Sequence, residues 1–229
     1  LDTCNKIMSS LRRKLEVKAY EAAKLYYKTQ NYKAAAVSLK LVLKDYPDIA
    51  EREEIAYMAM LSGYYYADKS VFAKQPERYL EANEGAVEFE SQYAGSSKLT
   101  EIPQLYEKGY FRAIESAYQW AQSTLGDKRV QALNLTIQHY HDYASFLKEE
   151  KNKESAANTM HKAYVALIKT NYYLAEEMKE IGESAPYYKA CAEAFNRYQA
   201  SYPTFITKEL ENLYQKSNEK ININNQSSL

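Results

Sequence analysis

The sequence predicts an all-α fold in which helical hairpins stack into a right-handed solenoid. Gly and Pro together account for 11 of the 229 residues (6 Gly and 5 Pro), which leaves few of the turns that a sheet protein needs. Tyr is abundant, with 24 residues against 6 Phe and 1 Trp. A tyrosine can bury its ring and keep its hydroxyl in water, so this excess suits thin helical layers with half-exposed faces. Apolar residues also recur at helical spacing on either side of very short links.

The first hairpin is expected near the start of the chain. Residues 11–28 carry one apolar stripe at three- and four-residue steps, which predicts a helix with one buried face: Leu11, Leu15, Ala19, Ala22, Ala23 and Tyr26. Residues 33–45 repeat this pattern through Ala35, Leu39, Val42 and Leu43, and Pro47 prevents the helix from continuing. Because only residues 29–32 join the two helices, we expect them to pack as antiparallel neighbours.

Further helices follow the same logic. Residues 51–68 and 79–93 form a second predicted pair, joined by a longer connector, 69–78, that Pro76 interrupts. A helix is expected over 99–123 if Pro103 lies in its first turn.

Blocks in the second half of the chain repeat blocks in the first half at an offset of about 107 to 108 residues. The repeated blocks are AYMA at 56–59 and AYVA at 163–166, the Tyr pairs 65–66 and 172–173, Tyr79 with Tyr187, and LYEK at 105–108 with LYQK at 213–216. This offset predicts two related modules, residues 1–123 and 127–216, with Tyr57 and Tyr164, Tyr79 and Tyr187, and Tyr106 and Tyr214 in equivalent places. The alternative is an unrelated helical domain after residue 127. Residues 217–229 lack an apolar stripe and are expected to form a flexible tail.

The sequence offers no recognisable catalytic, cofactor or metal site. Lys+Arg and Asp+Glu number 30 each, so no basic surface indicates nucleic acid. His139 and His141 are two residues apart and point away from each other on a helix, while His161 stands alone. The six glycines are at least ten residues apart, which excludes a phosphate-binding loop. Cys191 lies in an Ala-rich helical segment and is read as a buried thiol. We therefore expect a protein that is not an enzyme; the alternative is an active site spread over several helices.

Residues 19–47 resemble a tetratricopeptide repeat, a helical hairpin of 34 residues. The resemblance rests on small residues at the helix crossing, the YYK end of the first helix, Tyr32 in the turn and the closing Pro47, with Gln30 where Gly is common. In that family the first helix of each pair lines a concave groove. Carried over, this implies partner-binding residues, with aromatic anchors and Lys donors suited to an extended peptide: Tyr20, Lys24, Tyr27, Lys28, Gly63 and Tyr66. The alternative is that these tyrosines pack against the next repeat.

From Cys4 to Gly109 the chain resembles the C-terminal half of the BamD family of the Bacteroidetes lineage. The segments that carry this resemblance are CNK at 4–6, KAYEAAKLYYKTQNYKAAAVSLKLVLKDYPD, YYYADKSVFAKQPERYLEA, QYAGSSKL and LYEKG. It implies a non-catalytic scaffold at the periplasmic face of the bacterial outer membrane that acts with the BamA barrel in β-barrel protein assembly. The family's lipid-bearing Cys and first repeats would lie upstream of Leu1, so a membrane contact is expected only through that anchor. The family normally ends near the segment that matches Lys108, so the resemblance leaves the remaining residues unexplained. The alternative function is a peptide-binding tetratricopeptide adaptor unconnected with membranes.

Overall fold

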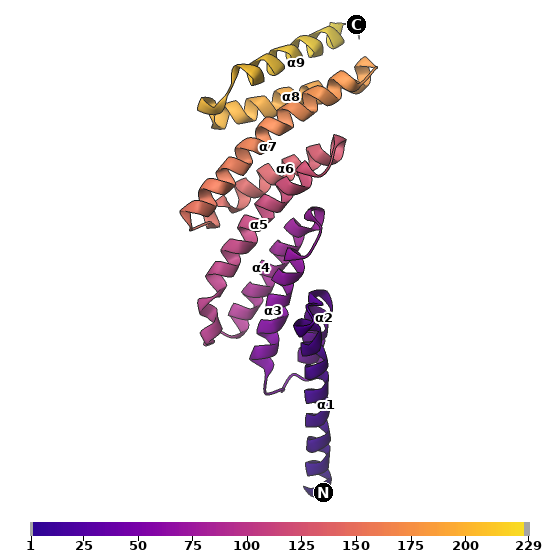
Figure 1. Ribbon diagram of the computed structural model, residues 1–229, viewed down its shortest axis with the longest axis vertical. Coiled ribbons are helices and arrows are strands. Elements are labelled where there is room, and N and C mark those ends of the chain that lie inside the picture. Colours follow the sequence, from indigo (N-terminus) through magenta and orange to yellow (C-terminus); the bar gives the residue numbers. More distant parts are fainter. Residues whose placement is uncertain (1, 227–229) are drawn as a thin grey trace. The chain divides into compact units, whose positions relative to one another are not determined.

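The computed structural model describes residues 2–226, and over these residues the chain is helical with no strand (Figure 1). The α-helices are α1 (Asp2–Lys28), α2 (Tyr32–Asp45), α3 (Arg52–Asp68), α4 (Gln75–Gln92), α5 (Ile102–Gln122), α6 (Gly126–Tyr143), α7 (Glu150–Glu177), α8 (Ile181–Ser201) and α9 (Lys208–Gln226). Short 3-10 turns follow α3, α4, α6 and α8. Within each unit, consecutive helices pack on each other (α1 to α4 and α6 to α9), as in helical repeat proteins, which confirms the predicted all-α helical repeat fold.

The chain divides into two compact units, Leu1–Gly109 (unit 1) and Tyr110–Leu229 (unit 2). This division falls inside α5 and not in the link at residues 124–127, where the sequence placed it. The reason is that the two ends of α5 belong to different cores. Ile102 packs with α3 and α4 in unit 1, whereas Ala121 packs with α6 and α7 in unit 2.

Unit 1 begins with the expected antiparallel hairpin of α1 and α2, and α3 packs against α2. Ala35 and Leu39 of α2 have no exposed surface, which lets the helices approach closely. The tight link requires a left-handed residue after α1, and Gln30 takes it with φ of 61°. A glycine adopts this conformation without the strain that a side chain causes.

The first half of α1 departs from the expectation of a buried apolar face. Leu11 and Leu15 are each 55% exposed. The cause is the difference in helix length, because α1 has 27 residues and α2 has only 14. The N-terminal turns of α1 therefore extend past α2 (Figure 1), and the packed face of α1 is formed closer to its C-terminal end, by Tyr20 and Ala23.

Helix α4 begins at Gln75, four residues before the predicted start. Pro76 does not break the helix, because it lies in the first turn, where the missing N–H needs no partner. The expected connector is correspondingly shorter. In α5, Pro103 also lies in the first turn, as predicted.

Unit 2 contains α6 to α9, with α7 packed between its neighbours along the chain. Its core includes Met160, Ala163 and Leu167 of α7 and Phe195 of α8. Residues 217–226, predicted to be a flexible tail, instead continue α9. Ser217 is fully buried and donates a hydrogen bond to the carbonyl of Leu213, so packing extends the helix beyond the last obvious apolar residues. Residues 227–229 of the predicted tail lie outside the described part of the chain.

Candidate functional site

Unit 1 contains a groove of about 520 Å³ between α2 and α4, with α3 as its floor; we call it the unit 1 groove. Small residues make up much of its surface, which lets the backbone of a bound chain approach closely. These small residues are Ala36, Ala56, Ala59, Gly63, Ala82 and Gly85. Both walls, α2 and α4, are the second helices of their hairpins.

The two walls of the unit 1 groove carry opposite charges. Lys40 and Lys44 line it from α2, and Glu81 and Glu88 line it from α4. These four side chains are exposed, and no ion pair joins one wall to the other within residues 2–226. Arg52 of α3 and Arg78 of α4 also line the groove; apart from these two arginines, it offers cations on α2 and anions on α4.

Of the six residues predicted to bind a partner, Gly63 and Tyr66 lie in this groove. Gly63 packs against Ala82 of α4, because a Cβ placed at Gly63 would lie 3.5 Å from the Cβ of Ala82, in ordinary van der Waals contact. The ring of Tyr66 is covered by the guanidinium of Arg78, 4.2 Å from the ring centroid. Arg78 also donates a hydrogen bond to Ser70, which fixes its position over the ring.

Tyr20 is placed elsewhere, because it is only 5% exposed and belongs to the core of unit 1. Its hydroxyl lies 3.7 Å from the sulfur of Met58 on α3. Lys24 lies over the ring at 5.0 Å, and its hydrogen bond to Tyr20 raises the pKa of Lys24. The expectation that Tyr20 presents its ring in a groove is therefore corrected: the ring packs between α1 and α3.

Tyr27 also packs against neighbouring helices, in a cluster with Tyr32 and Tyr65. The ring centroids of Tyr32 and Tyr65 are 4.9 Å apart, and Tyr27 lies 5.8 Å from the first and 6.2 Å from the second. Burial raises the pKa of Tyr27 to about 12. Lys28 at the end of α1 is exposed. The structure thus separates the six predicted residues into a packed group, Tyr20 and Tyr27, and a groove pair, Gly63 and Tyr66, with the two lysines beside the packed group.

The same chain of aromatic rings occurs in a hairpin of each unit. In unit 1, Tyr57 of α3 contacts Phe89 of α4 at 5.6 Å, and Phe89 contacts Tyr93 at 4.9 Å. In unit 2, Tyr164 of α7 contacts Tyr198 of α8 at 4.8 Å. Tyr198 in turn contacts the residue four positions later, Tyr202, at 5.8 Å. Tyr57 and Tyr164 therefore make corresponding contacts, as the repeat in the sequence predicts.

The predicted pair of Tyr79 and Tyr187 is corrected by the hydrogen bonds that each tyrosine makes. Tyr79 donates a hydrogen bond to Asp68 at the end of α3. The corresponding bond in unit 2 is made by Tyr188, which is 4% exposed and donates to Glu176 near the end of α7. The expected partner, Tyr187, is more exposed and donates instead to Asp127 at 2.6 Å. The offset is thus 109 residues on the second helix, one more than the sequence blocks indicate.

The third predicted pair, Tyr106 of α5 and Tyr214 of α9, contacts the preceding helix in each unit by different means. Tyr106 donates to Glu90 of α4 at 3.2 Å, whereas the ring of Tyr214 stacks on Phe195 of α8 at 4.5 Å. That these two tyrosines occupy equivalent places therefore stays a prediction.

Unit 2 has a larger groove, of about 800 Å³, that the sequence analysis did not identify; we call it the unit 2 groove. Its floor is one face of α7, and it is also lined by Tyr118 of α5, the start of α6, Tyr198 of α8 and Phe205 after α8. A signal for it was present in the sequence. The offset of 107 residues carries Gly63 and Tyr66 onto Thr170 and Tyr173, and both line this groove.

The remaining candidate residues for chemistry occupy structural positions. His139 is buried, with Nδ1 3.3 Å from the carbonyl oxygen of Ala113, and burial lowers its pKa. Cys191 is fully buried, as expected, and burial raises the pKa of its thiol. Within residues 2–226, no three His, Cys, Asp or Glu side chains come together as they would around a metal ion. Across the same described residues, no helix combines the length and the apolar character that crossing a membrane requires.

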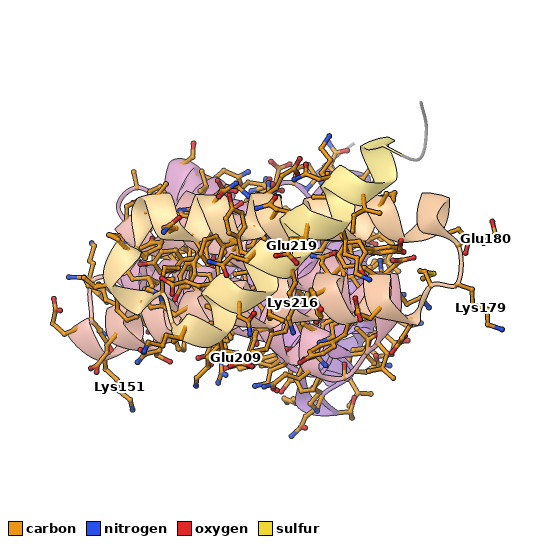
Figure 2. The ribbon with its side chains drawn as sticks, turned by 90° about the horizontal axis from the view of Figure 1, so that it is seen from above. Lys151, Lys179, Glu180, Glu209, Lys216 and Glu219 are labelled. Atoms are coloured by element: carbon orange, nitrogen blue, oxygen red, sulfur yellow. The ribbon has the colours of Figure 1, made fainter. Side chains whose placement is uncertain are left out.

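Figure 2 labels several charged side chains of unit 2. Lys151 projects at one end of α7, and Lys179 and Glu180 project at the opposite end, where α7 turns into α8 (Figure 2). Glu209 lies near the start of α9 and forms a salt bridge with Lys169, with 2.8 Å between the carboxylate oxygen and the ammonium nitrogen. Lys169 lines the unit 2 groove, so one of the cations of this groove is already paired with a carboxylate of the chain.

Comparison with known proteins adds little to this geometry. No protein-family model matches the chain, and no curated protein matches it either. A solved structure described as "Computational Design of Self-Assembling Cyclic Protein Homooligomers" aligns over 97% of this chain and 96% of its own, with 15% sequence identity and a TM-score of 0.25. A TM-score this low carries no argument about function.

Proposed function

We propose that the chain is a non-catalytic scaffold of the outer-membrane β-barrel assembly machinery, positioned at the periplasmic face of the outer membrane. It would bind a barrel-assembly component of the BamA type through the unit 1 groove. The resemblance of residues 4–109 to the BamD family supports the machinery, and the groove supports binding of a protein partner. The floor of the groove is α3, the first helix of its hairpin, so the partner would contact Gly63 and Tyr66 of the expected binding residues.

The observation that carries the proposal is the combination of a small-residue floor with walls of opposite charge. Ala59 and Gly63 let a partner helix or strand lie close to α3, so that dispersion contacts form along its length. Lys40 on α2 and Glu81 on α4 then select a partner segment with acidic residues on one edge and basic residues on the other. A segment of this kind docks in one orientation, because reversing it places like charges together.

Gly85 allows a direct test of the groove. A Cβ built at Gly85 meets no atom within 4 Å, so a large side chain there projects into the groove without disturbing the core. The variant Gly85→Trp should weaken binding of the purified periplasmic domains of the barrel component at least tenfold, as measured by isothermal titration calorimetry. The matched control is Val87→Trp on the same helix, at a position that is 56% exposed and outside the groove. Equal binding by both variants and the unsubstituted chain would remove the groove from the proposal, and no binding to the barrel component would remove the machinery.

Salt dependence supplies a second test of the same interface. Since the walls carry opposite charges and the chain has no net charge, its long-range field is weak. Affinity should therefore change by less than about tenfold between roughly 50 and 500 mM salt. A larger change would indicate an interface dominated by charge.

The alternative function is a peptide-binding adaptor without any link to membranes. The same wall charges favour it equally, because they recognise a peptide as well as a domain. The gene sequence upstream of the codon for Leu1 separates the two proposals. A signal peptide that ends in a lipid-modifiable cysteine supports the scaffold, and its absence from the full gene supports the adaptor.

A further inference from the structure

The unit 2 groove has three features that are independent of the unit 1 groove. It is long, its apolar lining is exposed, and it contains cations without protein partners. Each feature narrows the kind of molecule that fits.

The length of the groove matches a short extended peptide. Its floor is a stripe of α7 from His161 to Glu177. Sixteen helical steps at 1.5 Å each span about 24 Å. An extended chain rises about 3.3 Å per residue, so roughly seven residues cover that distance. The residues of α7 that line the groove recur at three- and four-residue steps, so they form one continuous stripe from one end of the floor to the other.

Exposed apolar side chains gather at this groove. Among the described residues of unit 2, five large apolar side chains are more than half exposed: Leu125, Phe146, Tyr173, Phe205 and Ile223. Three of them, Leu125, Tyr173 and Phe205, line the groove. Phe205 is held in place by stacking on His161, with ring centroids 3.9 Å apart. Because the exposed fractions of these three side chains are 80%, 53% and 51%, the apolar lining of the groove faces solvent.

The charged lining is mainly basic. Arg129, Lys162 and Lys169 line the groove, against one acidic residue, Glu177. Lys169 is paired with Glu209, but Arg129 and Lys162 form no ion pair among residues 2–226. The Nε atom of Arg129 is buried and has no hydrogen-bond partner in the described part of the chain. Because Arg129 lines the groove and forms no ion pair with any described residue, its guanidinium is the cation that a ligand carboxylate would find there.

We propose that the unit 2 groove is a second binding site, which takes an extended segment of another protein bearing alternate apolar side chains and at least one carboxylate. The apolar side chains contact Tyr173 and Phe205, and the carboxylate accepts a hydrogen bond from Arg129. This site lies wholly within unit 2, so it stands independently of the unit 1 groove and of the barrel-assembly partner.

The test uses the whole chain and a defined probe, the fluorescein-labelled heptapeptide LEFSLEF, with LKFSLKF as its charge-reversed counterpart. Fluorescence anisotropy should show saturable binding of LEFSLEF and at least tenfold weaker binding of LKFSLKF. Arg129→Gln and Phe205→Ser should each weaken the binding of LEFSLEF at least fivefold.

The chain offers a matched control for each variant. Arg197→Gln removes an exposed arginine of α8 that does not line the groove. Phe146→Ser removes a ring that is 52% exposed and stacked on one neighbour, Tyr110, much as Phe205 is stacked on His161. Binding should be unchanged in both controls and in Gly85→Trp, which separates this site from the unit 1 groove.

Three results would overturn the proposal. The first is equal binding of the acidic and basic peptides. The second is an equal loss of binding in the variants and their controls, which would indicate a general effect on folding. The third is displacement of the peptide by dodecanoate at an equal concentration, which would assign the groove to a lipid chain.

Discussion

Replacing Gly109 with alanine should destabilise the protein, although alanine normally favours a helix. A Cβ at position 109 of α5 would lie 2.0 Å from the side-chain oxygen of Asn83 on α4. That oxygen accepts a buried hydrogen bond from Tyr64 at 2.8 Å, and the amide nitrogen donates to the carbonyl of Tyr106 at 3.3 Å. Asn83 would have to turn away and give up both bonds.

The magnitude follows from two opposing effects. Disrupting the buried amide costs about 2–3 kcal/mol, while alanine in place of glycine gains about 1 kcal/mol of helix propensity. The free energy of unfolding should therefore fall by about 1–2 kcal/mol. At a denaturant dependence of about 2 kcal/mol per molar urea, the unfolding midpoint should fall by roughly 0.5–1 M.

The control is the same substitution at Gly85 of α4, where a Cβ meets no atom within 4 Å. Gly85→Ala should raise the midpoint by about 0.5 M, because only the helix propensity changes. Circular dichroism at 222 nm during urea unfolding measures both variants. If Gly109→Ala matched Gly85→Ala in sign and size, the Asn83 network would contribute nothing to stability and the reasoning would be refuted.

Three further predictions use the same unfolding measurement. Tyr188→Phe should lower the free energy of unfolding by about 1 kcal/mol through loss of a buried hydrogen bond, whereas Tyr187→Phe should change it by less than about 0.5 kcal/mol; equal effects would contradict the assignment of Tyr188 as the counterpart of Tyr79. Burial lowers the pKa of the His139 and His161 side chains, so below the ordinary histidine pKa near 6.5 the unfolded chain binds more protons than the folded one. The free energy of unfolding should therefore fall as the pH drops from about 7 to 5.5. If the same pH dependence persisted in the double variant His139→Gln, His161→Gln, it would point to other groups. Gln30→Gly should stabilise the protein by about 0.5–1 kcal/mol by relieving the left-handed strain, and a loss of stability would show that the hydrogen bond from Lys69 to Gln30 matters more.

Local sequence signals were sufficient for the helices but not for their environment. The spacing of apolar residues and the prolines placed α2, α3 and α5 within three residues, because both signals act within one or two turns. The end of α1 was also placed correctly, but the helix begins at Asp2, nine residues before the predicted start. The exposure of Leu11 could not be read from the same stripe, since it depends on how far the next helix reaches. The position of Gln30 was anticipated by the tetratricopeptide pattern, which favours Gly at the residue that the structure finds in the left-handed region.

The candidate sites were less accessible from sequence. Tyr20 and Tyr66 carry the same side chain at similar helical positions, yet one is in the core and the other lines a groove. The difference between them is which helix packs against each tyrosine after folding. That depends on contacts between residues far apart in the sequence. The unpartnered Nε of Arg129 likewise depends on which side chains surround it after folding.

The matching ring contacts of the two hairpins have a consequence for how the chain folds. Tyr57 contacts Phe89 across 32 residues, and Tyr164 contacts Tyr198 across 34. Proteins whose contacts join residues close in sequence fold rapidly, because little loop entropy is lost before a contact forms. Each hairpin can therefore close early and serve as a template for the helix that follows it, so folding of a unit is expected to spread from hairpin to neighbour along the chain.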